Sequence, residues 1–379
     1  MAAQRADDLI LCGGGVIGLA MAWQAARLGW RVRILERKRL GSGASWAGAG
    51  ILPPGALQNA HDPMEQLRAL SDEMFPDWCD ALCSETGIDV GFRRCGGVYL
   101  ARSNGEFSTL LANQAWWGDH GIAFQRWTAK EIAEHIPVLK PATNSAPLIA
   151  AWYLSGECQI RNPRYIKALA VACQKLGVAI HEEESMLQFE PNGGGIVVRT
   201  AKNHYASERM CITAGAWTPL AISDKKIQTG ILPIRGQMVL FRSKARLFIP
   251  VINEGHRYLV PRDDGYLLAG SCEEEAGFDE STTPEMIEQL TCWARQLVPA
   301  LEFASVERSW SGLRPGSMDG LPYLGKLPEY ENVYIAAGHY RHGIHLSPIT
   351  ALTMISLMTG AIPPLDLSPF RMARGKTCA

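Results

Sequence analysis

The chain has 379 residues, of which 47% are hydrophobic and 20% charged, and its formal net charge is -1. Such a composition is typical of a globular protein that is long enough for two domains or more, and it excludes extended disorder. The sequence has no block of like charge that would favour binding to nucleic acid or to an anionic membrane surface. Chemistry on a small molecule is therefore the better expectation.

Cysteine usage and hydropathy indicate a cytoplasmic protein without a membrane span. The 10 cysteines are irregularly spaced, include no C-x-x-C pair and are too sparse for a disulfide scaffold. The longest apolar stretch, residues 344–365, is interrupted by Pro348, Pro363 and Pro364, which favours a buried helix.

A nucleotide-binding motif stands at the N-terminus. Residues 9–18 form an apolar run that breaks into glycines and continues as a helical pattern. Gly13, Gly15 and Gly18 occupy the G-x-G-x-x-G positions, where glycine permits the tight turn, the approach of a pyrophosphate and close packing of helix on strand. A second apolar run ends at Glu36, where a carboxylate would accept from the ribose of FAD or NAD rather than NADP. The motif alone does not choose between FAD and NAD.

A second run of small residues covers residues 41–54. Such a run predicts backbone lying against a flat or charged ligand, and Ser45 there would cap a helix or donate to a phosphate. A flexible surface loop is the alternative, but Trp46, Ile51 and Leu52 argue against it, because a solvated linker has no use for them.

The remaining pattern alternates between helices and strands. Helical spacing predicts helices over residues 61–87, 107–121, 162–176, 283–297 and 347–359. Short apolar runs predict strands over residues 91–102, 178–181, 210–213, 236–241, 258–261, 266–269 and 333–336.

These elements predict an α/β protein, α+β overall, with a Rossmann-like domain and an inserted antiparallel-sheet substrate domain. We expect residues 1–90, 145–222 and 325–379 to form the discontinuous nucleotide domain, and residues 91–144 and 223–324 the inserted one.

Two clusters of potential metal ligands are better explained without a metal. Cys79 and Cys83 lie one helical turn apart, but no second pair completes a tetrahedral set. His339, His342 and His345 recur every three residues without carboxylates beside them. No metal is therefore expected.

Six stretches together resemble the glycine oxidase and D-amino-acid oxidase superfamily of flavoproteins, and are most similar to its glycine oxidase branch associated with thiamine biosynthesis. They are 13–18 with Glu36, 44–52, 214–217, 258–262, 312–316 with 319–322, and 338–341. The resemblance covers nearly the full chain, and its most specific motifs contain Arg314 and Arg341.

The resemblance implies non-covalent FAD and oxidation of an amine carbon next to a carboxylate. It implies that Arg314 grips the substrate carboxylate, that Tyr258 donates to it, and that Arg341 and His256 lie near the pocket. A guanidinium suits this task, because it forms two parallel bonds to a carboxylate. The predicted FAD contacts are Gly13, Gly15, Val16, Ile17, Gly18, Glu36, Arg37, Ser45, Ala49, Gly50, Ile51, Ala214, Gly215, Trp217, Gly338, His339, Arg341, His342, Gly343 and Ile344.

The implied reaction oxidises glycine, sarcosine or a small D-amino acid to the imine by hydride transfer to the flavin, with dioxygen as acceptor and hydrogen peroxide as product. Two alternatives stay open: a dehydrogenase that passes electrons to a quinone or carrier, and an FAD-binding protein without turnover. The branch usually carries Asn at the position of His342 and an aliphatic residue at that of His345, so the exact substrate is open. Both histidines are expected to contact the flavin ring, and the oligomeric state is not predicted.

Overall fold

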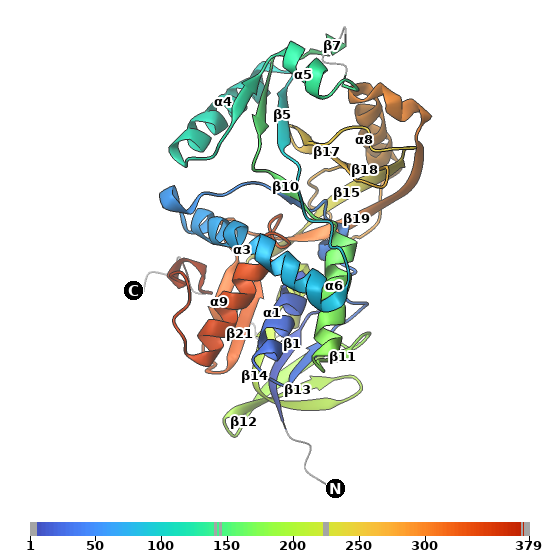
Figure 1. Ribbon diagram of the computed structural model, residues 1–379. Coiled ribbons are helices and arrows are strands. Elements are labelled where there is room, and N and C mark those ends of the chain that lie inside the picture. The colour runs from blue at the N-terminus through green and yellow to red at the C-terminus, as the bar shows by residue number, and fades with distance from the viewer. Residues whose placement is uncertain (1–5, 140–141, 144–145, 223–226, 373, 375–379) are drawn as a thin grey trace.

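The computed structural model describes residues 6–139, 142–143, 146–222, 227–372 and 374. It has two parts, each built on its own eight-stranded sheet (Figure 1). The first and last strands of the chain both lie in the lower part of this view, whereas most of the middle of the chain forms the upper part. The lower part is therefore assembled from segments far apart in the sequence.

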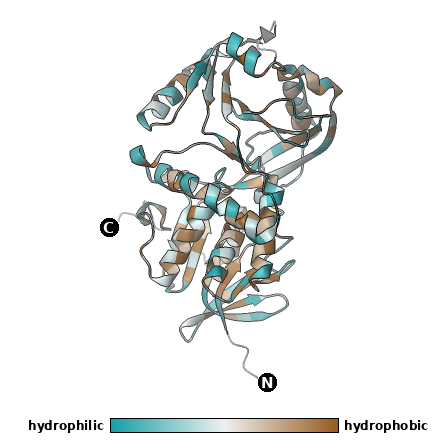
Figure 2. Cartoon of the chain, viewed as in Figure 1, coloured by the Kyte–Doolittle hydropathy of each residue, from teal (hydrophilic) through white to brown (hydrophobic). Residues whose placement is uncertain are grey.

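The lower sheet has a core of parallel strands. In spatial order these are β11 (Ala179–His181), β2 (Val32–Leu35), β1 (Asp7–Cys12), β14 (His204–Ile212) and β21 (Val333–Ala337). Next to β21 runs β20 (Tyr323–Lys326), which is antiparallel to it. The carboxyl-terminal ends of β1 and β14 and the whole of β21 are apolar and buried, since they lie in the middle of the sheet. Figure 2 shows apolar residues concentrated on the elements of this part.

Helices cover one face of this sheet, and a hairpin extends its edge (Figure 1). The helices are α1 (Val16–Arg27), α3 (Pro63–Thr86), α6 (Asn162–Lys175) and α9 (Ser347–Thr359). Their apolar faces form one core with the strands. The strands β12 (Met186–Asn192) and β13 (Gly195–Thr200) pair antiparallel and continue to β14. This hairpin is absent from the predicted elements, because its first strand is partly exposed and weakly patterned.

The upper sheet is antiparallel apart from the pairing of β5 with β16. Its spatial order is β19 (Ser305–Ser317), β15 (Ile231–Arg242), β18 (Tyr266–Gly270), β17 (Arg257–Pro261), β16 (Val251–Glu254), β5 (Gly97–Ala101), β9 (Ala150–Leu154) and β6 (Gln125–Trp127). The helices of this part are α4 (Asn104–Asp119), α5 (Ala129–His135) and α8 (Pro284–Leu297). The predicted Rossmann-like domain with an inserted antiparallel sheet is thus confirmed.

Further short helices and strands connect these elements. They are α2 (Ala44–Ala47), β3 (Ile51–Leu52), β4 (Arg93–Arg94), β7 (Ala142–Thr143), β8 (Ala146–Pro147), β10 (Cys158–Gln159) and α7 (Thr218–Ala221). Most predicted helices and strands appear with shifted ends, for example α4 from Asn104 instead of residue 107. Its earlier start has a local cause, since Ser103 and Glu106 form a capping box. The strand predicted over residues 91–102 is instead two strands, β4 and β5, which belong to different sheets.

Strand pairing suggests two adjustments to the predicted domain boundaries. β9 follows residue 145, yet it pairs with β5 and β6 of the upper sheet. β20 begins at Tyr323 and pairs in the lower sheet. We therefore propose boundaries after Leu154 and before Tyr323. The predicted limits at residues 144, 145 and 223 lie outside the described residues.

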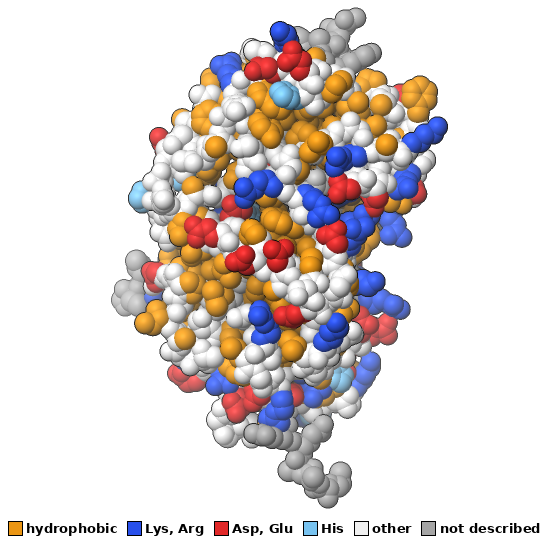
Figure 3. All heavy atoms as spheres, in the orientation of Figure 1, with side chains coloured by type: hydrophobic (Ala, Val, Ile, Leu, Met, Phe, Trp, Pro, Cys, Tyr) orange, Lys and Arg blue, Asp and Glu red, His pale blue; other side chains and the backbone are white. Residues whose placement is uncertain are grey.

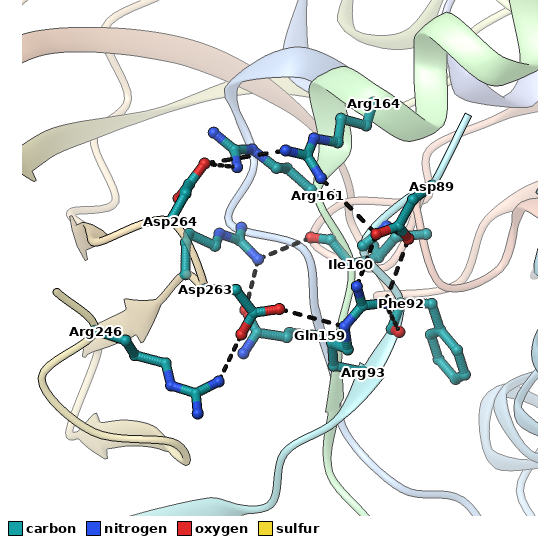
Figure 4. Close-up of polar contacts among 12 residues, drawn as sticks. Asp89, Phe92, Arg93, Gln159, Ile160, Arg161, Arg164, Arg246, Asp263 and Asp264 are labelled. Carbon is teal, nitrogen blue, oxygen red and sulfur yellow. Dashed lines mark hydrogen bonds and ion pairs between the residues drawn. The ribbon is translucent and has the colours of Figure 1, made fainter. Parts of the chain in front are cut away.

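Charged side chains join the two parts beside α6 (Figure 4). Asp264, from the turn before β18, pairs with Arg161 at the start of α6. Asp89, from the lower part, pairs with Arg93 of β4 at 2.7 Å, and Arg93 also pairs with Asp263 at 3.3 Å. These side chains are partly exposed, and such pairs are worth about 0–1 kcal/mol each. Their main effect is therefore to fix how the parts meet.

The outer surface shows no concentration of one charge on the face seen in Figure 3, where acidic and basic side chains are interspersed. Among the described residues, no helix has the length and apolar character needed to cross a membrane.

Candidate active site

A pocket of about 600 Å³ lies where the two sheets meet. Its lining comes from the turns after β1, β2, β14 and β21, and from the strands β15, β17 and β19. The carboxyl ends of parallel strands are where open α/β sheets bind ligands. All predicted FAD contacts line this pocket except Gly18 and Gly338.

The glycine turn has the shape that its motif predicts. Gly13 has φ +127°, and a Cβ there would lie 2.4 Å from the carbonyl oxygen of Thr213. A Cβ on Gly18 would lie 2.0 Å from the carbonyl oxygen of Gly13. Gly18 therefore lets the first turn of α1 pack against the glycine turn, and it does not itself line the pocket because it faces Gly13.

Glu36 is held in place by backbone donors. Its Oε2 accepts from Gly14 N at 2.7 Å and its Oε1 accepts from Lys38 N at 2.8 Å. These bonds fix the carboxylate at the carboxyl end of β2, and each oxygen keeps lone pairs for a further donor. The position is suited to a ribose hydroxyl.

Ser45 stands at the N-terminus of α1. Its Oγ accepts from Val16 N at 2.9 Å, so it caps one of the free N–H groups there. The hydroxyl proton is left to donate, and an anion at this helix end would also be stabilised by the helix dipole. Both predicted uses of Ser45, capping and donation to a phosphate, are therefore compatible.

The run of small residues lies between the pocket and β19. A Cβ on Gly312 would lie 2.4 Å from Ala47 Cβ, and Trp310 Nε1 donates to the Ala47 carbonyl at 3.0 Å. Buried Arg262 donates to the Ala49 carbonyl at 2.7 Å, and burial lowers the pKa of Arg262 to about 10. These contacts attach the pocket wall to the upper sheet. Arg262 ends the stretch 258–262 that carries the family resemblance, but no role was predicted for it.

Arg37 and Trp217 are in contact across the nucleotide end of the pocket. The guanidinium carbon of Arg37 lies 3.7 Å from the centre of the Trp217 ring. Both residues were predicted as FAD contacts, but their cation–π contact joins turns after two different strands and has no sequence pattern.

The segment after β21 is fixed by neutral histidines. His339 is 3% exposed, and its Nε2 lies 3.1 Å from Thr350 Oγ1 of α9. Burial lowers the pKa of both His339 and His342 to about 3. Gly338, with φ +84°, provides the turn but does not line the pocket.

His345 differs from its prediction. Its side chain is 2% exposed and packs against Phe75 of α3, so it does not line the pocket as His342 does. The reason is that the chain after Ile344 turns into α9 and points this side chain toward α3. Within the described residues, no group of three or more His, Cys, Asp or Glu side chains is placed to hold a metal.

Arg314 is anchored at the substrate end of the pocket. One terminal nitrogen donates to the Cys272 carbonyl at 3.0 Å, and the other to Ser271 Oγ at 2.6 Å. A Cβ on Gly236 of β15 would lie 2.3 Å from this guanidinium. Gly236 therefore makes room for Arg314, whose remaining N–H donors stay available to a carboxylate.

Tyr258 lies on the same pocket-lining surface. Its hydroxyl points to Met238 Sδ at 3.3 Å, and a Cβ on Gly270 would lie 2.8 Å from its ring. Because sulfur is a weak acceptor, this hydroxyl is able to donate to a carboxylate oxygen. Met238 and Gly270 were not predicted, although glycine inside a strand is a general sign of close approach.

Arg341 has an acidic partner that was not predicted. Its Nε donates to Glu273 Oε1 at 2.9 Å, and the Tyr340 hydroxyl donates to the same oxygen. Burial disfavours the Glu273 carboxylate, but the Tyr340 and Arg341 hydrogen bonds outweigh burial and lower the pKa of Glu273. The charge of Arg341 is thus balanced before a ligand binds.

His256 is not brought into the pocket. It sits in the turn between β16 and β17, its side chain is 81% exposed, and its Nδ1 lies 4.0 Å from Glu273 Oε2. It is absent from the pocket lining because the turn projects it away from the sheet face. A direct role in the site therefore has no support from this geometry.

The cradle at Gly13, the acceptor Glu36 and the capped helix end fit FAD, and the chain belongs to a family with that cofactor. Residues 8–357 match the family described as "FAD dependent oxidoreductase". The predicted family resemblance, the enzyme class and FAD as the cofactor are thereby confirmed.

Individual relatives cover almost the whole chain. The glycine oxidase of Geobacillus kaustophilus (strain HTA426) is 33% identical over 97% of this chain and 97% of its own length. The glycine oxidase of Pseudomonas putida (strain KT2440) is 32% identical over 96% of this chain and 97% of its own length. The crystal structure of glycine oxidase from Geobacillus kaustophilus superimposes with a TM-score of 0.92, at 32% identity, over 98% of this chain and 99% of that one.

Proposed function

We propose that this chain is an oxidase of small amino acids: glycine, sarcosine or a small D-amino acid is oxidised at the amine carbon, and dioxygen is reduced to hydrogen peroxide. The observation that carries the proposal is the placement of Arg314 and Tyr258 on one wall of the cofactor pocket. The imine product would then be hydrolysed to an oxo acid and an amine: glycine would give glyoxylate and ammonia, and sarcosine would give glyoxylate and methylamine.

Arg314 would bind the substrate carboxylate with the N–H donors that Ser271 and Cys272 leave free. A charge-assisted hydrogen bond of this kind is worth about 1.5–3 kcal/mol. Tyr258 would donate to the same carboxylate after leaving the weak contact with Met238. These bonds orient the amine carbon, and orientation lowers the barrier by removing rotational freedom before reaction.

FAD, when bound, supplies the acceptor for the two electrons of the amine oxidation. The chain itself supplies charge stabilisation around it. The N-terminus of α9 follows Gly343 and Ile344, which line the pocket. A helix N-terminus stabilises nearby negative charge by up to about 2 kcal/mol in a partly buried setting. His339 and His342, being neutral, add no opposing charge.

The test is an anaerobic titration of the FAD-loaded protein with glycine, sarcosine, D-alanine and D-proline while the visible flavin band is recorded. Bleaching by one of these ligands, followed by peroxide formation when oxygen is admitted, is the expected result. Bleaching without reoxidation by oxygen would instead favour a dehydrogenase with another acceptor. No bleaching by any of them would refute the proposal.

The matched variant is Arg314→Ala, in which flavin retention should stay unchanged. The substrate concentration for half-maximal bleaching should rise by roughly 10- to 100-fold, which is equivalent to about 1.5–3 kcal/mol of lost binding energy. Equal titration curves for the variant and the parent protein would remove Arg314 from its role.

A further inference from the structure

A buried acid lies behind the wall of the pocket, on the far side of Tyr258 from Arg314. The side chain of Glu157 is 0% exposed. The Tyr99 hydroxyl donates to its Oε2, and Asn253 Nδ2 donates to its Oε1 at 3.2 Å. Tyr99 and Asn253 both line the pocket, whereas Glu157 itself does not.

The strand register places these groups in one row with the substrate wall. Tyr99 of β5 is opposite Asn253 of β16, and Asn253 is opposite Tyr258 of β17. Residues directly opposite on neighbouring strands project to the same face of a sheet. Tyr99 and Asn253 therefore continue the surface that carries Tyr258 and, further along, Met238.

The chain is built to hold the acid in this place. A Cβ on Gly97 would lie 2.4 Å from Glu157 Oε1, so only glycine there leaves room for the carboxyl group. The Glu157 carbonyl accepts from Cys95 N at 3.2 Å and from Gly96 N at 2.9 Å, which fixes the backbone. A loosely placed surface acid would need none of these features.

The hydrogen bonds decide which atoms face the pocket. A carboxylate only accepts, so Asn253 must turn its NH₂ group to Glu157 and leave Oδ1 outward, and the single proton of the Tyr99 hydroxyl is committed to the same carboxylate. Within the described residues no side chain or backbone group donates a hydrogen bond to Asn253 Oδ1. Both pocket-facing groups therefore present acceptor oxygens in front of a buried acid.

No described cation forms an ion pair with Glu157. The thiols of Cys95 and Cys158 lie near it, and burial raises the pKa of each well above its usual value, so they are neutral. Arg68 of α3 pairs with Glu65 at 3.3 Å. The partners of the acid among the described residues are therefore neutral hydrogen-bond donors.

We propose that Tyr99, Asn253 and Glu157 form an anionic subsite of the substrate pocket that binds an ammonium group of the ligand. The inference rests on the proposed function for the carboxylate end of the pocket, where Arg314 stands. With both ends in use, the pocket selects zwitterions over plain carboxylates. The ammonium belongs either to the α-amine or to a side chain, and the experiment below distinguishes the two.

Ionisation of the acid gives the subsite a pH dependence. Burial raises the pKa of Glu157 to about 7, despite the opposing hydrogen bonds of Tyr99 and Asn253. Above that pH the carboxylate is charged and attracts a cation, and below it the acid is neutral. The preference for an ammonium should therefore weaken as pH falls through 7.

The experiment measures equilibrium binding by calorimetry to the FAD-loaded protein, with pairs of ligands that differ by NH₃⁺ against CH₃. One pair is 2-aminoisobutyrate and pivalate, and the other is 4-aminobutyrate and pentanoate. The α-amine pair lacks an α-hydrogen to be oxidised, so binding is read apart from turnover. We expect the amino member of one pair to bind at least roughly tenfold more tightly, equivalent to about 1.4 kcal/mol, and that pair identifies the source of the ammonium.

Glu157→Gln and Tyr99→Phe should each remove this preference while affinity for the methyl member stays the same. Tyr205→Phe is the matched control, because Tyr205 also donates to a glutamate, at 3.0 Å, but lies outside the pocket. The inference is overturned if the parent protein shows no preference in either pair, or if both variants keep it. Absence of turnover with preserved ammonium selectivity would instead refute only the proposed oxidase function.

Discussion

Gly236→Ala is the substitution whose effect the structure defines most closely. The added methyl carbon would lie 2.3 Å from one terminal nitrogen of Arg314, 2.4 Å from the other and 2.5 Å from the carbon between them. Such distances are not tolerated, but the group in the way is the end of a flexible side chain and not backbone. The strand should therefore persist while Arg314 leaves its bonds to Ser271 and Cys272.

The expected magnitude follows from the carboxylate bonds that a displaced guanidinium no longer makes. Loss of about 1.5–3 kcal/mol corresponds to a roughly 10- to 100-fold weaker affinity for substrate. FAD retention and thermal stability should change little, because Gly236 lies on β15 of the upper sheet whereas Gly13 and Glu36 belong to turns of the lower sheet.

The assay is anaerobic flavin bleaching over a range of glycine concentrations, together with the melting temperature. Gly105→Ala, in α4, makes the same chemical change where a Cβ meets nothing within 4 Å, and serves as the control. An unchanged substrate dependence in Gly236→Ala would show that Arg314 does not hold the carboxylate.

Three further predictions concern the cofactor turn, the second arginine and the neutral histidine. Glu36→Gln should raise the dissociation constant of FAD roughly tenfold, since about 1.5 kcal/mol of charge-assisted hydrogen bonding is lost. The fluorescence of FAD released on dilution measures this constant, and an unchanged constant would place the ribose contact elsewhere. Glu273→Gln should release Arg341 and Tyr340 for a second carboxylate, so that malonate, a dicarboxylate, inhibits more strongly while the KM for glycine stays within about twofold. Unchanged inhibition by malonate would contradict this. In the folded chain burial lowers the pKa of His339 from 6.5 to about 3, so the unfolded chain binds a proton more readily below pH 6.5. The free energy of unfolding should therefore fall by up to about 1.4 kcal/mol per pH unit between pH 6.5 and 4. Urea unfolding at pH 7.5 and 5.5 measures this fall, which should be smaller in His339→Gln. An equal fall in the variant and the parent protein would refute the prediction.

Local patterns determined much of the fold. The turn at Gly13, the carboxylate of Glu36 and the strands and helices around them follow from steric rules that act within a few residues. These parts were predicted correctly because backbone conformation and hydrophobic periodicity are short-range properties. The positions of Arg314 and Arg341 were found through whole motifs that resemble a known family.

The sequence alone therefore determined the glycine turn and the order of most elements, and it predicted which residues would grip a carboxylate. Only the tertiary structure decided that β9 joins the upper sheet, that Glu273 balances Arg341, that His256 points to solvent, and that Glu157 stands behind Tyr99. These contacts join residues distant in the chain, and their formation depends on strand pairing and burial. No local pattern encodes such pairings, because they are selected by the packing of the complete chain.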